Sequence, residues 1–332
     1  MITSIGLNPC IDTVIKVKSI KPGHYDVQPK YFPGGTAINV VLVSKKLKES
    51  GKIDKLTKVF YSGFIDNGKI YKLLRKRKIS TKYCVFIKGE TRINYTILPI
   101  KGEEIHLKSE GPIITKSEYE KFENVYNEII KDSNVVIISG KLPKNTSEYY
   151  YNKLIEKAQT SNIHTAIDIR GETLKQAIKS NPFFIKCNLT ELSVLLNNKN
   201  KLQSFDDILD AESILKHYDI PLAVISAGKN GMFVFYKGKF LAQYKISCEL
   251  LTKSTIGAGD IILFYFSYLF DSVKRDIKKL NKETINECSI ISSAYASAST
   301  LTPYPSVFNL TVAEKLIKKI EVIKKVGKIS FN

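Results

Sequence analysis

Short apolar runs alternate along this chain with segments of helical periodicity. The runs occupy residues 135–138, 165–168, 183–185 and 223–225, and helical spacing is found, for example, at residues 147–158 and 206–217. Continuous apolar runs are typical of strands that are buried on both faces, and their alternation with helices predicts βαβ units. The sequence therefore predicts an α/β fold with a mainly parallel central sheet that is covered by helices.

Two stretches, residues 12–33 and 90–108, show a different pattern. Apolar and polar residues alternate within them, at residues 13–17 and 92–97, as in half-exposed antiparallel strands. No linker rich in Pro, Gly or Ser, no internal repeat and no low-complexity tract divides the chain. We therefore predict a single domain over residues 1–332, with a small β lid formed by about residues 12–33 and 90–108.

Polar residues follow several of the predicted strands at the point where each strand ends. They are Ser139 with Gly140, Asp168, Asn188 and Ser226. In open parallel sheets, ligands bind beyond the carboxyl ends of the strands. The sequence therefore predicts a ligand site at this edge of the sheet.

The chain is strongly basic. Its 332 residues include 51 Lys and Arg against 32 Asp and Glu, a net charge of +19. Such a surplus attracts nucleic acid, anionic membranes or phosphorylated metabolites. Because the lysines are spread along the whole chain, we favour a solvated lysine-rich surface over a dedicated nucleic-acid face.

The five cysteines are scattered, odd in number and never spaced as CxxC. This spacing argues against a disulfide framework and against structural zinc, and it indicates a reducing compartment. The start of the chain lacks the charged and long apolar regions of a signal peptide. The most apolar stretch, residues 261–270, has about half the length of a membrane span. We expect a soluble, cytoplasmic protein.

The strongest chemical signal is the segment Gly257-Ala258-Gly259-Asp260, which directly precedes the apolar run 261–270. Its glycines allow a tight turn with outward-facing amide groups, and the N-terminus of the following helix adds partial positive charge, so the segment makes an anion site. An aspartate beside an anion site makes sense as the base for an attacking hydroxyl, which is the chemistry of a kinase. Alone, the pattern fits an aspartate that caps a helix equally well.

The GAGD segment resembles the signature of the ribokinase-like (PfkB) carbohydrate kinases, whereas neither a Walker A loop nor a dinucleotide fingerprint is present. Further segments resemble this family in the same order along nearly the whole chain. They are residues 7–12 (LNPCID), 32–35 (FPGG), 38–40 (INV), 91–94 (TRIN), 139–143 (SGKLP), 168 with 171–172, 186 with 188–191 (NLTE), and 226–231 (SAGKNG). The first segments are similar to the subgroup of 1-phosphofructokinase and tagatose-6-phosphate kinase. The resemblance implies a three-layer, ribokinase-like fold.

On the sugar side of the site, the resemblance implies a set of substrate-binding residues. They are Asp12, Gly34, Gly35, Asn39, Arg92 and Ser139. Asp12 and Asn39 would hydrogen-bond sugar hydroxyls, and Arg92 on a lid strand would hold the phosphate that the substrate already carries. Taken singly, Asp12 also fits a turn residue, and Arg92 also fits an ordinary surface charge.

On the nucleotide side, the resemblance implies ATP and Mg²⁺. The residues that would contact ATP are Lys186, Asn188, Ser226, Gly228 and Gly231, and those that would organise Mg²⁺, partly through water, are Asn188 and Glu191. Asp260 would deprotonate the sugar hydroxyl while the amides of Gly257, Ala258 and Gly259 stabilise the transferring phosphoryl group. Singly, Glu191 also fits the first turn of a helix, and the glycines at 228 and 231 also fit a plain hairpin.

Departures from the family pattern bear on activity. Thr36 and Ala37 stand where the subgroup has lysine and glycine, so a substrate-side cation is lost; Arg170, where the family has serine, is our candidate replacement. Bulky residues fill positions 261–265 after GAGD, and residues 302–306 (TPYPS) stand where relatives often have a glycine-bearing stretch near the adenine. Both changes are expected to affect helix packing and nucleotide binding.

Taken together, the resemblance implies a kinase that phosphorylates a hydroxyl of a sugar phosphate. Fructose 1-phosphate is the first choice, because residues 32–35 and 92–94 lean toward 1-phosphofructokinase, and tagatose 6-phosphate is the alternative. A catalytically weakened family member that serves as a binding or regulatory protein also stays open. We expect neither a specific nucleic-acid partner nor a membrane. A homodimer through the lid is expected, because half-apolar lid strands gain from being covered.

Overall fold

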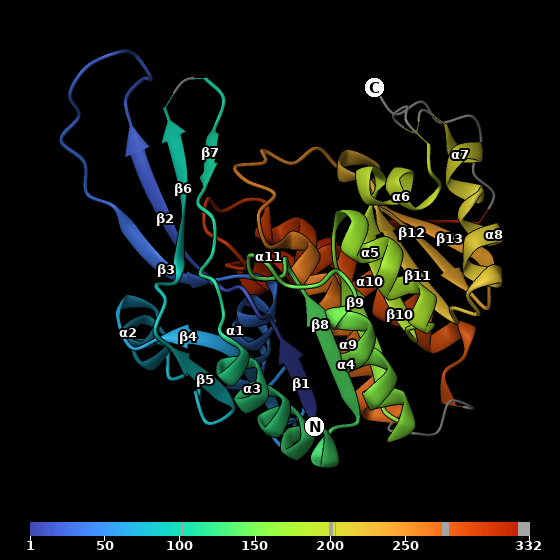
Figure 1. The fold of residues 1–332 in the computed structure, drawn as a ribbon. Helices are drawn as coiled ribbons and strands as arrows, with labels where there is room; N and C mark the ends of the chain where they lie inside the picture. The colour runs from blue at the N-terminus through green and yellow to red at the C-terminus, as the bar shows by residue number, and fades with distance from the viewer. Residues whose placement is uncertain (101, 199–201, 203, 274–278, 325–332) are drawn as a thin grey trace.

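The computed structural model of the chain describes residues 1–100, 102–198, 202, 204–273 and 279–324 (Figure 1). A ten-stranded sheet forms its centre, in the order β14-β13-β12-β11-β10-β9-β8-β1-β4-β5. The strands are β1 (Ile2–Ile5), β4 (Val59–Asp66), β5 (Cys84–Ile87), β8 (Val135–Ser139), β9 (His164–Asp168), β10 (Phe184–Asn188), β11 (Leu222–Ser226), β12 (Met232–Tyr236), β13 (Lys239–Ile246) and β14 (Ile320–Ile323). In this spatial order, all neighbouring strands from β11 to β5 pair in parallel. Strands β12, β13 and β14 extend the sheet beyond β11 as antiparallel strands.

Helices cover both faces of this sheet and enclose two apolar cores. One face carries α3 (Lys116–Ile129), α4 (Tyr150–Thr160), α5 (Gly171–Ala177), α6 (Leu189–Leu195), α7 (Phe205–Leu209) and α8 (Ala211–His217). The other carries α1 (Thr36–Glu49), α9 (Ala258–Val273), α10 (Lys282–Ser299) and α11 (Leu310–Ile317), and α2 (Lys69–Lys76) packs beside β4. The result is the predicted α/β fold in three layers. Within the described part of the chain, no helix has the length and apolarity needed to cross a membrane.

The predicted central strands are confirmed, with ends that differ by at most one residue except in β10, which extends three residues beyond its predicted end. The helix predicted over residues 206–217 is observed as α7 and α8, which are separated at Asp210. Ser204 caps α7 in a capping box with Asp207, so the first helix begins one residue before the predicted segment.

Residues 261–266 of helix α9 are all apolar and all buried, so this part of the helix is covered on every side. Ile261, Leu263 and Phe264 are fully buried, and α1 and α10 flank the helix. Phe266 stacks on Phe184 of β10 with ring centroids 5.1 Å apart. The bulky residues after GAGD therefore hold the helix that carries Asp260 firmly against the sheet.

A second sheet of four strands, in the order β3-β2-β6-β7, stands apart from the main body (Figure 1). Its strands are β2 (Cys10–Val17), β3 (Lys30–Gly34), β6 (Arg92–Pro99) and β7 (Ile105–Lys108), and residue 101 of the expected lid lies outside the described residues. The prediction that these strands are all antiparallel is wrong, since β2 and β6 pair in parallel. Each excursion is an antiparallel hairpin that leaves the main body in the same direction, so the two outgoing strands run side by side.

Candidate active site

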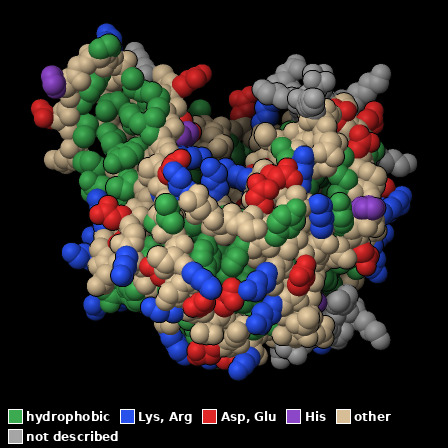
Figure 2. All heavy atoms as spheres, viewed as in Figure 1, with side chains coloured by type: hydrophobic (Ala, Val, Ile, Leu, Met, Phe, Trp, Pro, Cys, Tyr) green, Lys and Arg blue, Asp and Glu red, His purple; other side chains and the backbone are tan. Residues whose placement is uncertain are grey.

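A cavity of about 1980 Å³ opens between the second sheet and the carboxyl ends of the central strands. Figure 2 shows the hollow between these two parts of the molecule, with Lys and Arg side chains gathered at its floor. The strand ends that line it are Ser139 of β8, Asp168 of β9, Asn188 of β10 and Ser226 of β11. Its size exceeds that of an ordinary small-molecule pocket, so two substrates can bind side by side.

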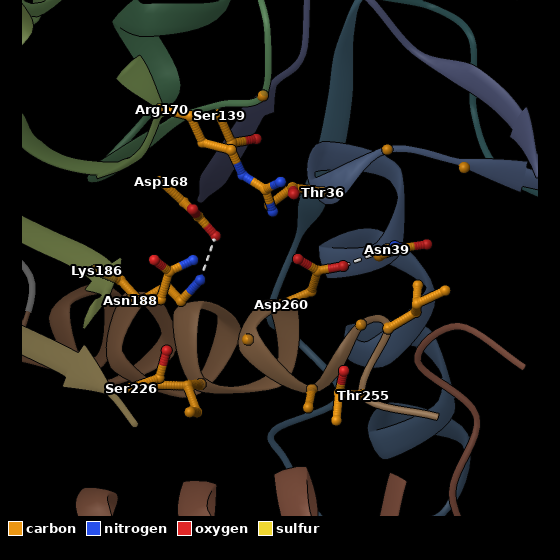
Figure 3. Close-up of a pocket in the computed structure, with 18 of the residues that line it drawn as sticks. Thr36, Asn39, Ser139, Asp168, Arg170, Lys186, Asn188, Ser226, Thr255 and Asp260 are labelled. Atoms are coloured by element: carbon orange, nitrogen blue, oxygen red, sulfur yellow. Dashed lines mark hydrogen bonds and ion pairs between the residues drawn. The ribbon is translucent and has the colours of Figure 1, made fainter. Parts of the chain in front are cut away.

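Asp260 lies in the first turn of α9 and is held by a residue of α1. Its Oδ2 atom accepts a hydrogen bond of 2.6 Å from Nδ2 of Asn39, and the side chain is only 7% exposed (Figure 3). Burial, followed by the negative charge of Asp168, raises the pKa of Asp260, whereas the Asn39 hydrogen bond opposes that rise. The carboxylate is therefore a stronger base than an ordinary aspartate and is aimed into the cavity.

The turn before Asp260 presents backbone to the cavity. Gly257, Ala258 and Gly259 all line it, and the Ala258 amide forms only a long bond of 3.3 Å to the Thr255 carbonyl. The amides of a first helical turn have no partners within their own helix. They are therefore available to an anion, and the dipole of α9 adds to the attraction.

Lys186 approaches this turn from β10. A Cβ atom at position 259 would lie 2.6 Å from the Lys186 ammonium nitrogen, so glycine there makes room for the cation. Lys186 also forms a buried ion pair of 3.0 Å with Asp168 (Figure 3). Burial opposes the charge of Lys186, but Asp168 and Glu191 outweigh it and raise the pKa of the ammonium group. A permanent positive charge thus stands beside the anion site.

On the opposite side, Asp12 and Arg92 face the cavity from the second sheet. Asp12 Oδ1 accepts a hydrogen bond of 3.1 Å from Nδ2 of Asn94, and any side chain at Gly34 would collide with the Asp12 carboxylate. Arg92 donates to the carbonyl of Asn8 at 3.1 Å and to Oδ1 of Asn94 at 3.3 Å. Both charged groups are thereby fixed in orientation before any ligand arrives.

Ser139 and the loop of residues 226–231 have mainly structural roles in the absence of a ligand. The Ser139 hydroxyl is buried and bonds to the Ile5 carbonyl at 3.3 Å, and the Ser226 hydroxyl bonds to the Cys187 carbonyl at 3.3 Å. Gly228 and Gly231 belong to the turn of the β11–β12 hairpin, which lines the cavity. These positions lie where the sequence predicts a ligand, with their hydroxyls already engaged.

Asn188 and Glu191 cap the N-terminus of α6. Asn188 Oδ1 accepts from the Glu191 amide, and Glu191 Oε2 accepts from the Asn188 amide, both at 2.9 Å. Glu191 Oε1 has no hydrogen bond and lies 3.0 Å from Arg170 Nε as an ion pair. Burial, followed by Asp168, raises the pKa of Glu191. Asn188 lines the cavity, whereas Glu191 stands behind its wall.

A metal ion would find only part of its ligand shell here. The described residues hold no group of three or more His, Cys, Asp or Glu side chains with metal-binding geometry. Glu191 Oε1 accepts no hydrogen bond and has the Arg170 guanidinium as its ion-pair partner, and Asp168 lies near. A cation that takes its remaining ligands from water and phosphate could share these carboxylates if Arg170 moved aside. The residues therefore fit Mg²⁺ bound jointly with a nucleotide.

The structure thus brings together at one cavity every predicted site residue except Glu191. Sequence reasoning gave no role to Asn94, Lys108 or Lys141, which line the same cavity. The spacing of positions 92 and 94 on one strand was the available signal for Asn94, because alternate residues share a face. No comparable signal marked Lys108, one lysine among many.

Comparisons with known proteins show the family of the chain. The sequence matches the family described as pfkB family carbohydrate kinase over residues 4–303. It is 30% identical over 274 residues to a 1-phosphofructokinase of Borreliella burgdorferi, which covers 82% of this chain and 85% of that protein. It is 27% identical to a tagatose-6-phosphate kinase of Staphylococcus epidermidis, over 98% of this chain and all of that protein.

A solved structure shares the fold. The crystal structure of a possible 1-phosphofructokinase from Thermotoga maritima superposes with a TM-score of 0.80 at 21% identity, over 98% of this chain and 99% of that one. The predicted ribokinase-like fold is thereby confirmed. Since the family match spans most of the chain, the protein is a kinase that belongs to the pfkB family of carbohydrate kinases.

Proposed function

We propose that this kinase transfers the γ-phosphoryl group of ATP to a hydroxyl of a sugar phosphate, with Asp260 as the base. The observation that carries the proposal is the buried Asp260 carboxylate, which faces a large cavity directly beside the backbone amides of a helix N-terminus. A base and an anion site in contact are what phosphoryl transfer to an alcohol requires.

The reaction follows from these positions. Asp260 takes the proton of the sugar hydroxyl, the hydroxyl oxygen forms a bond to the γ-phosphorus, and the bond from that phosphorus to the β-γ bridging oxygen breaks. The amides of Gly257, Ala258 and Gly259 and the Lys186 ammonium hold the phosphoryl oxygens, where negative charge is greatest. ADP leaves with the bridging oxygen.

Asn188 and Glu191, with Asp168 nearby, would hold Mg²⁺ through water and ATP oxygens. When bound, the ion neutralises phosphate charge. The loop of residues 226–231 would lie against the nucleotide. The second sheet would act as the lid of a single domain and exclude water from the transferring group.

Fructose 1-phosphate is the proposed acceptor, and tagatose 6-phosphate is the second candidate. Relatives named for both activities align over most of the chain, and the two acceptors share similar hydroxyls but carry the phosphate at different ends. The retained base, anion site and buried cation weigh against a purely regulatory protein. All five cysteines are unpaired, which suits the reducing cytoplasm, where we place the reaction.

We further propose that two copies of the chain associate through the second sheet. Tyr31, Tyr95 and Leu107 share the face opposite to Asp12, by strand register, and each is more than a third exposed; Tyr95 and Leu107 also border the cavity. Figure 2 shows the apolar surface over this sheet. Another copy of the same sheet is the proposed cover, because a self-complementary apolar patch pairs about a two-fold axis.

Replacing Asp260 by Asn tests the role of the base. Turnover of fructose 1-phosphate with ATP should fall by about 10²- to 10⁴-fold, because the amide cannot accept the proton. The assay covers a panel of free and phosphorylated ketoses, with thermal unfolding as the check on folding. Asp132→Asn, an exposed acid outside the cavity, is the matched control. Turnover by Asp260→Asn at the wild-type rate would rule out the proposed mechanism.

The pH profile tests the same carboxylate. Because the raised pKa of Asp260 must be exceeded before it can accept a proton, kcat/KM should fall on the acid side at a higher pH than for an ordinary aspartate. Asn39→Ala removes a donor that stabilises the Asp260 carboxylate, so the pKa of Asp260 should rise further. The fall of kcat/KM on the acid side should then occur at still higher pH. Asn94→Ala removes a hydrogen bond to Asp12 and not to Asp260, so it should not change the pH at which kcat/KM falls. If kcat/KM of Asn39→Ala falls at the same pH as in the wild type, Asp260 is not the base.

Glu191→Gln tests the magnesium proposal. Glutamine at this position keeps the capping box but removes the charge. The Mg²⁺ concentration for half-maximal velocity, and the concentration for half-saturation in a direct Mg²⁺ titration with an unreactive ATP analogue, should each rise about tenfold. Glu172→Gln, on the exposed start of α5, should change neither value. Equal values for wild type and Glu191→Gln would exclude Glu191 from the metal site.

Light scattering on a sizing column tests the dimer. The wild-type chain should elute with twice its mass of 37.5 kDa, and Leu107→Glu should elute as a monomer, because a charge would be buried at the interface. Leu56→Glu, at an exposed apolar residue outside this sheet, should remain a dimer. A wild-type protein that elutes as a monomer would rule out this interface.

A further inference from the structure

Four cations reach the sugar side of the cavity from four separate segments. Arg92 and Lys108 come from the second sheet, and Lys141 and Arg170 come from loops beyond the central strands. Like charges gathered in one place repel one another. An anionic ligand that binds between these cations would therefore reduce their mutual repulsion.

Strand register places the first pair on one face. Asn94 is the pairing partner of Asp12 on one side and of Lys108 on the other, so these side chains form a row across the sheet. Arg92 shares this face with Asn94, because alternate residues of a strand point the same way. The face that carries Asp12 thus also carries two cations.

The second pair comes from adjacent strand ends. Ser139 of β8 and Asp168 of β9 are register partners at the carboxyl edge of the central sheet. Lys141 follows Ser139 and Arg170 follows Asp168 at the same distance along the chain. Both residues therefore follow neighbouring strand ends, and both line the cavity that the row on the second sheet also lines.

The cations influence one another, and of the four only Arg170 has an ion-pair partner within the described ranges. The pKa of Lys108 is lowered, first by burial and then by the charges of Arg170, Arg92 and Lys141. Lys108 and Lys141 have no ion pair within the described ranges, and Glu110, which Lys141 influences, pairs with Lys144 instead. Arg170 uses only Nε for Glu191, and its side chain is 62% exposed.

The cluster lies on the far side of Asp260 from the nucleotide loops. In Figure 3, Arg170 and Thr36 are on one side of Asp260, and Ser226 and Thr255 are on the other. The Arg170 guanidinium is directed into the cavity toward the side that carries Thr36. Arg170 can therefore supply, from across the cavity, the cation that is lost at position 36.

We infer that Lys108, Lys141 and Arg170 join Arg92 in binding the phosphate that the sugar already carries, and so make the enzyme select a phosphorylated sugar over a free one. A phosphate monoester presents several anionic oxygens, which suit a guanidinium fork together with two ammonium groups. The inference rests on the proposed function and deepens it by assigning the specificity for the acceptor.

Equilibrium binding without nucleotide tests the cluster. The proteins are the wild type, the single variants Lys108→Gln, Lys141→Gln and Arg170→Gln, the triple variant, and Lys72→Gln as a matched control, because Lys72 is an exposed lysine outside the cavity. The Kd of fructose 1-phosphate or tagatose 6-phosphate should rise about tenfold in each single variant and more in the triple variant. The Kd of unphosphorylated fructose should not change.

The outcomes separate this inference from the proposed function. If the wild type phosphorylates a sugar phosphate and the triple variant binds that sugar phosphate equally well, the inference is overturned and the function stands. If no sugar phosphate is turned over, inorganic phosphate is the probe. If inorganic phosphate protects the wild type and Lys72→Gln against thermal unfolding but does not protect the triple variant, the phosphate-binding role of the cluster is supported. Equal protection in all proteins, or none in any, overturns it.

Discussion

The site depends on a carboxylate that is held out of water at the start of a helix. Burying Asp260 costs free energy, and the structure offsets that cost with the Asn39 amide and the positive charge of Lys186. Lys186 in turn is kept charged by Asp168. Each buried charge is stabilised by a partner on another element. Helix α1, helix α9 and strands β9 and β10 must therefore all be in place before any of these charges is stable.

Packing of α9 makes this arrangement possible. Its residues 261–266 are apolar and buried, and α1, α10 and the sheet flank them, so the turn that carries Asp260 cannot shift without disturbing the core. Rigid support matters because a base and an anion site act together only at hydrogen-bonding distance. The bulky residues that depart from the family pattern thus lie where rigidity is required.

The second sheet brings a different kind of contribution. It carries Asp12, Asn94, Arg92 and Lys108 on one face, opposite the strand ends that carry Lys141 and Arg170. The surplus of positive charge that seemed a general property of the surface is thus partly concentrated at the cavity. A field of this kind raises the local concentration of anionic substrates before contact.

The sequence by itself determined the alternation of buried strands and helices, the anion turn with its aspartate and the family, because these are encoded by neighbouring residues. It also marked Thr36 as the position of a lost lysine and Arg170 as a candidate replacement. Only the tertiary structure decided that β2 and β6 run in parallel, that Glu191 caps a helix behind the cavity wall, and that Lys108, Lys141 and Arg170 line one cavity. These facts depend on contacts between segments far apart in the chain, for which local residue patterns carry no information.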